Sequence, residues 1–346
     1  MRTPVSLFRL LFSMLLLLPV AAAVAGTDGV VSARQARHLL DRLGYGPAPG
    51  DVARVRTMGV AAYVDGQLAP PALPRYLETR LRSAGAEDAR LLRAIASPRQ
   101  LEEVLTAFWL AQFGIAADQG WEAAQAAAVG RDAVRPHVFA RYAVLRAAVA
   151  RHPALQGRAV GGDERAAMHA LAREFVAAPP AALLRALEEA WDRTRGDQRA
   201  VLRRLFTHPA FLAPQEAGSK RKGAFRFVVS AVRAAGLDVE DVAPLRQVLD
   251  AREALTQDER MAFATRLAAG GLPLAPAPQR QRWASSAPPL RVKSEGEDGP
   301  GTVAGPGPVS MEAPTPSAAA MAAARNRPEH PDELKALLQS DDFLHF

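Results

Sequence analysis

The feature that most constrains the fold is the helical spacing of apolar residues along nearly the whole stretch 32–269. Ser32 is placed to cap a helix in which Leu39 and Leu43 share one face, and similar spacing recurs in the later segments. Alternating strand patterns bounded by turn signals are absent from this stretch. We therefore predict an all-α fold, an orthogonal bundle of about a dozen short helices packed helix on helix.

The motif inventory excludes several kinds of chemistry. The chain has 346 residues and no Cys, which excludes thiol catalysis and Cys-ligated metal sites. It contains no H-E-x-x-H spacing, no phosphate-binding loop and no G-x-S-x-G nucleophile motif. We therefore assign no catalytic residue, no metal and no cofactor from the sequence.

The positive charge of the chain is dispersed. The formal net charge is +7, and 39 of the 43 basic residues are Arg, mostly interspersed with acidic residues. A nucleic-acid-binding footprint would need these charges clustered, so we expect no nucleic-acid partner. The densest run is Lys220-Arg221-Lys222. We expect an exposed loop there, and a phosphate or sulfate site is the alternative.

The first 25 residues have the pattern of a signal peptide. Arg2 and Arg9 precede an apolar run, and Ala23-Val24-Ala25 matches the small-x-small rule for cleavage. The uncharged stretch 10–25 is shorter than the ~20 residues that span a bilayer. We expect cleavage near Ala25, a periplasmic or secreted product, and membrane contact through the signal peptide alone.

The remainder divides into three parts. Residues 26–270 form the predicted helical domain, and residues 271–328 are so rich in Pro and Gly that we predict a disordered linker. Residues 329–346 carry Leu334, Leu338 and other apolar residues at helical spacing. A helix this short is marginal in isolation, so we expect it to pack on the helical domain.

Two pairs of polar residues could carry a site. His38 and Asp41 share one helical face, for which we expect a surface hydrogen bond rather than a metal site. Glu102 and Glu103 lie among helical apolar residues. We expect a solvated helix face, and a catalytic carboxylate pair is the alternative.

Several blocks carry a resemblance to a known family. The stretch His38-Leu-Leu-Asp-Arg-Leu-Gly-Tyr-Gly-Pro-x-Pro-Gly-Asp51 resembles the opening of the bacterial exported family called domain of unknown function 1800. Later blocks resemble it in the same order: Leu105-x-x-Phe108-Trp109-x-x-x-Phe113, Val134-Arg135-Pro136-His137 to Leu155, Lys220-x-Lys222 to Ala235, and Leu337-Leu338-x-Ser340-x-x-Phe343.

The resemblance implies an exported, mostly helical protein with no established activity. Members are often encoded beside a second exported family, the sulfatase-like domain of unknown function 1501, which makes that protein the expected partner. Residues of the shared blocks are the candidates for binding: Arg42, Tyr45, Trp109, Arg135, His137, Lys220 and Lys222. For Arg42, Arg135 and His137 we expect capping and ion pairing between helices, with a polar active centre as the alternative.

The chain also departs from the family. Between Gln156 and Glu164 it lacks a segment on the order of a hundred residues, which is the size of a domain. Ala111-Gln112 stands where the family has Asn-His. We therefore predict a non-catalytic binding or interaction protein of the cell envelope. The alternative is a divergent hydrolase or envelope-polymer-modifying enzyme with a degraded active centre that includes Arg135 and His137.

Overall fold

The computed structural model describes residues 31–115, 120–156, 158, 160, 162–237, 239, 241–249, 254–272 and 331–346. The predicted signal peptide lies outside these residues, and so does the predicted linker apart from residues 271 and 272. In the described part the chain forms helices and no strand, with two isolated backbone bridges, so the all-α prediction is confirmed. No helix in this part is long and apolar enough to cross a membrane.

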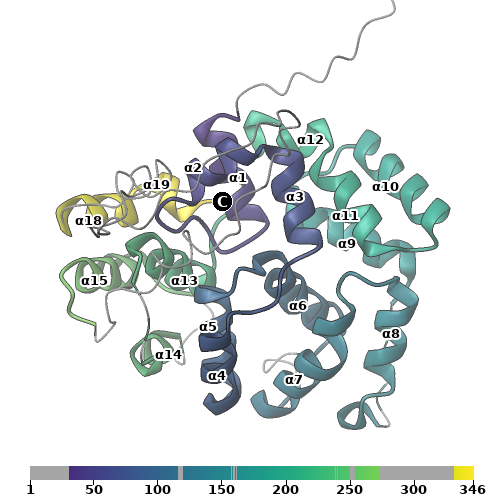
Figure 1. The fold of residues 1–346 in the computed structure, drawn as a ribbon, viewed down its shortest axis with the longest axis horizontal. Coiled ribbons are helices and arrows are strands. Elements are labelled where there is room, and N and C mark those ends of the chain that lie inside the picture. Colours follow the sequence, from purple (N-terminus) through teal and green to yellow (C-terminus); the bar gives the residue numbers. More distant parts are fainter. Residues whose placement is uncertain are drawn as a thin grey trace, which may run out of the picture. The chain divides into compact units, whose positions relative to one another are not determined.

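The described part contains seventeen α-helices, most of them short (Figure 1). In chain order they are α1 Ala33–Arg42, α2 Asp51–Met58, α3 Val60–Leu68, α4 Arg75–Ser83, α5 Ala86–Ala96, α6 Gln100–Gln112, α7 Ala123–Val129, α8 Tyr142–Ala150, α9 Glu164–Phe175, α10 Ala181–Thr194, α11 Gln198–Phe206, α12 Pro209–Leu212, α13 Ala224–Ala235, α14 Ala243–Leu249, α15 Gln257–Ala268, α18 Pro331–Gln339 and α19 Asp341–Leu344. Single turns of other helix types are Gly130–Val134 (π) and Arg135–His137, Pro153–Leu155 and Pro214–Glu216 (3-10).

Helix α1 begins as its sequence predicts. The Ser32 hydroxyl accepts a hydrogen bond from the Gln35 backbone, and the Gln35 side chain accepts one from the Ser32 backbone. This reciprocal capping satisfies two of the amide groups that a helix N-terminus leaves without partners. The buried face of α1 includes Leu39 and Leu43, as the spacing indicates.

The apolar faces meet in one hydrophobic core. Trp109 of α6 is fully buried, and its ring lies 5.4 Å from that of Tyr142 and 5.7 Å from that of Phe113, measured between centroids. Phe175, Phe206 and other large side chains extend the core through the later helices. The packing of short helices on one another buries apolar surface that a single helix would leave exposed to water.

Two differences from the expected helix boundaries have a physical cause. The apolar residues Phe139, Tyr142, Leu145 and Val149 predict a helix over 138–149. However, α8 begins at Tyr142, because the preceding backbone is held in an antiparallel bridge between Arg141 and Asp197. The Tyr142 amide donates to the Gly196 carbonyl at 2.9 Å. Helix α7 is built largely of alanine, so its segment carries too few large apolar residues to show a periodic face.

The C-terminal segment packs on the rest of the described chain. Figure 1 shows α18 and α19, drawn in yellow, next to α13 and α15. Beyond α19 the backbone pairs with the segment 220–222: the Lys220 and Phe346 peptide groups exchange hydrogen bonds of 3.1 and 2.7 Å, and the Lys222 amide donates to the Leu344 carbonyl at 2.8 Å. The backbone of the segment 220–222 is therefore paired with the end of the chain, while the Arg221 side chain is exposed.

Candidate functional site

Three cations, Arg42, Lys220 and Arg226, lie over the ring of Phe346, and Lys222 lies over the nearby ring of Phe343. We call this group the Phe346 cluster: Arg42, Lys220, Lys222, Arg226 and Phe346. Its members come from the end of α1, from the segment before α13, from α13 itself and from the C-terminus. Three of the seven residues that the sequence singles out belong to it, and a fourth, Tyr45, lies against Arg226.

Arg42 is the most buried cation of the cluster, with 1% of its surface exposed. Its Nη2 donates to the Glu216 carbonyl at 2.8 Å and to the Ser219 hydroxyl at 2.6 Å, and it lies 3.8 Å from the Glu216 carboxylate. Burial lowers the pKa of Arg42 to about 10, and the charge of Glu216 opposes that shift. Arg42 is therefore still protonated at neutral pH, although its Nε and Nη1 have no hydrogen-bond partner among the described residues.

Lys222 is 3% exposed, so the expectation of an exposed basic loop is wrong at this residue. Its Nζ lies 3.6 Å from the Asp41 carboxylate and 4.1 Å from the centroid of the Phe343 ring. Burial lowers the pKa of Lys222, and Asp41 opposes the shift. The sequence could not indicate this burial, because the residues that cover the lysine come from the C-terminal segment.

Lys220 is half-buried and caps a different helix. Its Nζ donates to the carbonyl oxygens of Arg173 and Glu174, at 2.9 and 2.6 Å, in the last turn of α9. A cation at a helix C-terminus satisfies free carbonyls and interacts favourably with the helix dipole. Two of the three donor groups of the Lys220 ammonium are therefore used within the chain.

Arg226 was missed by the sequence analysis. Its Nη1 donates to the carbonyl oxygens of Asp41 and Gly44, at 2.7 and 2.6 Å, and so caps the end of α1. Its guanidinium carbon lies 5.2 Å from the centroid of the Tyr45 ring. The available signal was a single charge inside the apolar run from Phe225 to Val229.

His38 and Asp41 are buried, with 5% and 7% of their surfaces exposed, so the expected surface hydrogen bond is wrong. The His38 Nε2 donates to the Phe211 carbonyl at 2.8 Å, and the ring lies 4.8 Å from that of Phe211. Burial, with a further contribution from Arg42, lowers the pKa of His38 to about 4. His38 is therefore neutral at physiological pH.

Arg135 belongs to a second ionic group. Its Nε and Nη2 donate to the two carboxylate oxygens of Glu103 at 3.3 and 2.8 Å, and Arg93 lies 4.0 Å from the same carboxylate. Glu102 and Glu103 are both buried, so the expected solvated face is wrong. Burial raises the pKa of Glu102. These acidic residues point inward because the turn Arg135–His137 and α5 cover this part of α6.

Trp109 and His137 have separate environments. Trp109 is a core residue whose indole Nε1 has no hydrogen-bond partner among the described residues. His137 is half-buried, and its Nδ1 donates to the Ala133 carbonyl at 2.8 Å across the π-helical turn Gly130–Val134. Neither residue takes part in the Phe346 cluster.

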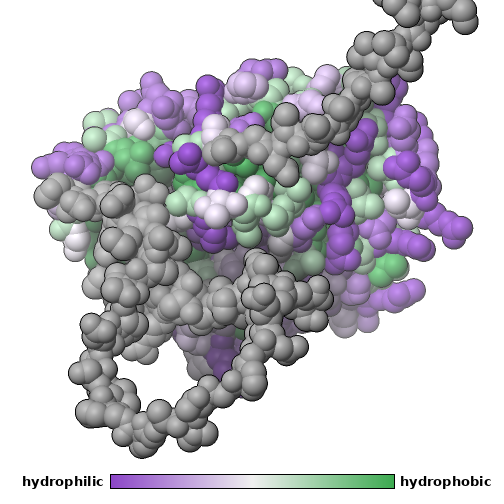
Figure 2. Space-filling model, turned by 45° about the horizontal axis from the view of Figure 1, so that its top comes forward, coloured by the Kyte–Doolittle hydropathy of each residue, from purple (hydrophilic) through white to green (hydrophobic). Residues whose placement is uncertain are grey.

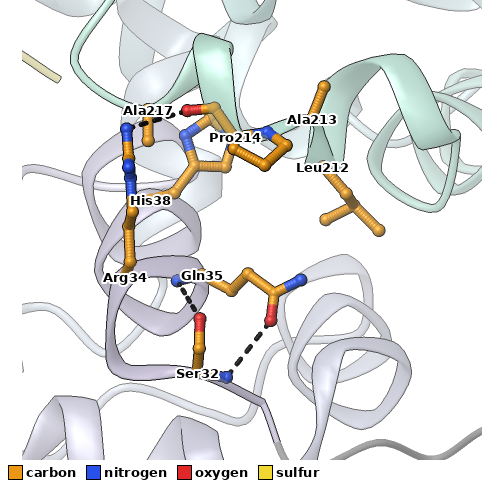
Figure 3. Close-up of a pocket in the computed structure, with 8 residues that line it drawn as sticks. All are labelled: Ser32, Arg34, Gln35, His38, Leu212, Ala213, Pro214 and Ala217. Carbon is orange, nitrogen blue, oxygen red and sulfur yellow. Dashed lines mark hydrogen bonds between the residues drawn. The ribbon is translucent and has the colours of Figure 1, made fainter.

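Two hollows lie on the described part of the chain. One, of about 270 Å³, is shown in Figure 3 and is lined by Ser32, Arg34, Gln35, His38, Leu212, Ala213, Pro214 and Ala217. Arg34 donates to the Pro214 carbonyl at 3.0 Å, and Ser32 and Gln35 bond to each other. Most polar groups that line this hollow thus form hydrogen bonds within the chain.

The second hollow has a different character. It measures about 670 Å³ and is lined by Arg141, Arg193, Thr194, Arg195, Asp197, Arg199, Ala200 and Arg203. We call it the arginine groove. Five guanidinium groups with one carboxylate can hold an anion, but the lining has no histidine, and its hydroxyl at Thr194 donates to the Ala190 carbonyl. Among the described residues, no group of three or more His, Asp or Glu is placed to hold a metal ion.

A comparison with known protein families gives a match. The model of the family described as "Protein of unknown function (DUF1800)" matches residues 38–156 and 165–284. The interruption, residues 157–164, falls where the missing segment is predicted. No curated protein and no solved structure gives a significant match.

Proposed function

The chain belongs to the DUF1800 family, whose function is unknown, and from this premise we propose that it is a non-catalytic binding protein of the bacterial cell envelope. The proposal needs an export route, which the predicted signal peptide 1–25 supplies. It also needs the family-motif residues to stabilise the fold rather than to take part in catalysis. Finally, it needs an exposed surface that can bind a partner.

One observation carries the proposal: the charged residues of the family motifs bond to one another and to the backbone. Arg42 pairs with Glu216, Lys222 with Asp41, and Arg135 with Glu103. A catalytic centre needs a nucleophile or a general base that converges with other ionisable groups on an accessible cleft. In the Phe346 cluster Arg42 and Lys222 are instead buried, and Lys220 and Arg226 bond to backbone carbonyl groups. Outside the cluster, the Nδ1 of the neutral His38 is buried without a partner among the described residues.

The test is co-purification from the native envelope. Cells that produce the full chain would be cross-linked, and the protein precipitated from an envelope extract with an antibody against it. We expect stoichiometric recovery of a second exported protein, with the sulfatase-like product of a neighbouring gene as the first candidate, or of a cell-surface polymer. An exported protein of similar abundance, precipitated in parallel, is the control. Recovery of the chain alone would count against the proposal.

A second function, a divergent hydrolase or envelope-polymer-modifying enzyme, is favoured by one observation. His137 ends the 3-10 turn Arg135–His137 that follows the π-helical turn Gly130–Val134, and π-helical turns are frequent at functional sites. Its Nε2 forms no hydrogen bond with the described residues. The variant His137→Ala separates the two functions. An enzyme would lose turnover of isolated envelope polymer, whereas a binding protein would keep its partner and show no turnover in either form.

A further inference from the structure

The arginine groove lies where three helical segments meet. Arg141 directly precedes α8, Arg193 and Arg195 lie at the end of α10, and Arg199 and Arg203 lie on α11. Figure 2 shows hydrophilic residues along the side of the molecule on which Figure 1 places α10 and α11.

Backbone bonds hold the three segments together. The bridge between Arg141 and Asp197 includes a hydrogen bond from the Gln198 amide to the Ala140 carbonyl at 3.2 Å. The turn after α10 is closed by a bond of 2.8 Å from the Gly196 amide to the Trp191 carbonyl. The groove is therefore preformed by the fold and does not depend on side-chain contacts between its arginines.

The groove has more positive than negative charge. The carboxylate of Asp197 accepts a hydrogen bond from the Ala200 amide and so caps α11. Arg203 pairs with Asp65, and Arg199 donates to the Leu68 carbonyl. The other three arginines, at positions 141, 193 and 195, are exposed, and their side chains form no hydrogen bond or ion pair with the described residues.

Arg195 occupies an uncommon backbone conformation. Its φ is 56° and its ψ is 48°, and no other residue apart from glycine in the described part has a positive φ. Glycine or asparagine usually fills this left-handed position at a helix end. The helix dipole of α10 accounts for a cation near its end, but not for the cations that α11 and the segment before α8 bring to the same hollow.

We propose that the arginine groove binds the phosphate groups of a linear anionic polymer outside the cytoplasm. This inference rests on the proposed function and names the class of partner. A guanidinium group bonds to a phosphate in a bidentate manner, and several of them in one hollow match a ligand that repeats its charge. A volume of about 670 Å³ is in the range of sites for ligands much larger than a single phosphate.

Binding of inorganic polyphosphate of defined length to the full chain tests the inference. The groove variant changes Arg141, Arg193 and Arg195 to Gln. The control variant changes Arg75, Arg82 and Arg266 to Gln, which removes the same charge from exposed positions on α4 and α15. We expect the groove variant to bind at least about tenfold more weakly and the control variant less than about twofold more weakly, since exposed charge contacts contribute most where several converge.

Salt dependence gives a second readout. Each phosphate contact releases counterions, so affinity falls as salt rises. Loss of three arginines should make the slope of log affinity against log salt shallower by about two. Replacement of the same three arginines by Lys keeps this slope while affinity falls, because the charge remains and the bidentate geometry is lost. Melting curves of the Gln and Lys variants of the groove should coincide with that of the unaltered chain, since the side chains of Arg141, Arg193 and Arg195 form no bonds with the described residues.

Three results would overturn the inference: equal loss of affinity in the groove and control variants, unchanged binding in the groove variant, or tighter binding of polyglutamate of equal charge. The last result would indicate an acidic protein as the partner. Such a failure is distinguishable from failure of the proposed function, because co-purification of an envelope partner with the groove variant would still support a binding protein that uses another surface.

Discussion

The guanidinium carbon of Arg226 lies 4.1 Å from the centroid of the Phe346 ring, and this contact joins α13 to the C-terminus. Arg42 lies 4.9 Å from the same centroid. Because both cations are also bonded to carbonyl groups of neighbouring segments, the ring closes a junction of α1, the segment 214–222 and α13. Desolvated cation–π contacts of this kind contribute up to about 2 kcal/mol each.

The first prediction concerns this contact. In a double-mutant cycle of Phe346→Leu and Arg226→Met, urea denaturation should give a coupling free energy of about 1 to 2 kcal/mol. The control cycle pairs Arg226→Met with Phe175→Leu, a core ring that packs on Phe206, and should give a coupling near zero. Equal coupling in the two cycles would show that the Phe346 ring acts through packing alone.

The second prediction is a pH dependence that originates at His38. The pKa of His38 is about 4 in the folded chain and about 6.5 when unfolded, so between these values the unfolded chain binds an additional proton. The free energy of unfolding should therefore decrease as pH falls from about 6.5 towards 4, by about 3 kcal/mol from this group. Arg42 and Arg34 both disfavour the charged form, and burial is the main cause.

The variant His38→Gln isolates this effect. Glutamine can keep the donor to the Phe211 carbonyl but does not titrate. The stability difference between the two proteins should be constant above pH 7 and should shift in favour of the variant at lower pH. Parallel curves of unfolding free energy against pH for the two proteins would contradict the assignment.

The third prediction concerns the ion pair between Glu103 and Arg135. Glu103→Gln leaves Arg135 and Arg93 without a charged partner in a largely buried place, so we expect a loss of about 3 kcal/mol in the free energy of unfolding. The double variant with Arg135→Gln should lose less than the sum of the two single variants. Asp132→Asn, in the exposed pair with Arg131, is the control and should cost less than about 0.5 kcal/mol. A similar small loss for Glu103→Gln would be inconsistent with burial of the pair.

The fourth prediction separates stability from binding at Arg195. Glycine adopts the left-handed conformation without a steric penalty, so Arg195→Gly should stabilise the chain by about 0.5 kcal/mol, after the entropy of glycine in the unfolded chain is included. The same variant should bind polyphosphate more weakly. Thermal denaturation and the titration described above measure the two effects. A variant that is less stable but binds polyphosphate as before would indicate that Arg195 stabilises the C-terminal end of α10 and does not contact the polymer.

The fifth prediction addresses export. Fractionation should place the protein outside the cytoplasm, and N-terminal sequencing should begin at Gly26. A charge in the apolar run, Leu16→Arg, should keep the uncleaved chain in the cytoplasm, because the segment can no longer enter the membrane. A cytoplasmic protein with an intact N-terminus would refute both the signal peptide and the envelope role.

Much of the fold was predictable from local pattern. Capping of α1 by Ser32 and the apolar faces of most helices follow from contacts between residues three or four positions apart, which the sequence displays directly. The alanine-rich α7 and the delayed start of α8 were not predicted. The first has too few large apolar residues for a periodic signal, and the second depends on a bridge to Asp197, which is remote in the sequence.

The candidate site was predictable only in part. Arg42, Tyr45, Lys220 and Lys222 were singled out by family resemblance, and the structure brings them to one place. Their partners Arg226, Glu216 and Phe346 were not foreseen. Each partner is distant in the sequence from Arg42, and short-range spacing carries no information about such pairs.

By itself the sequence determined that the chain is helical, belongs to the DUF1800 family and starts with the pattern of an exported protein. Only the tertiary structure decided which charged side chains are buried and which are exposed without a partner among the described residues. Periodicity describes one helix at a time, whereas the environment of a charge depends on the segments that pack around it. For this reason Lys222, which lies in a basic run, is enclosed, while the distant Arg141 joins the arginines of residues 193–203 in the arginine groove.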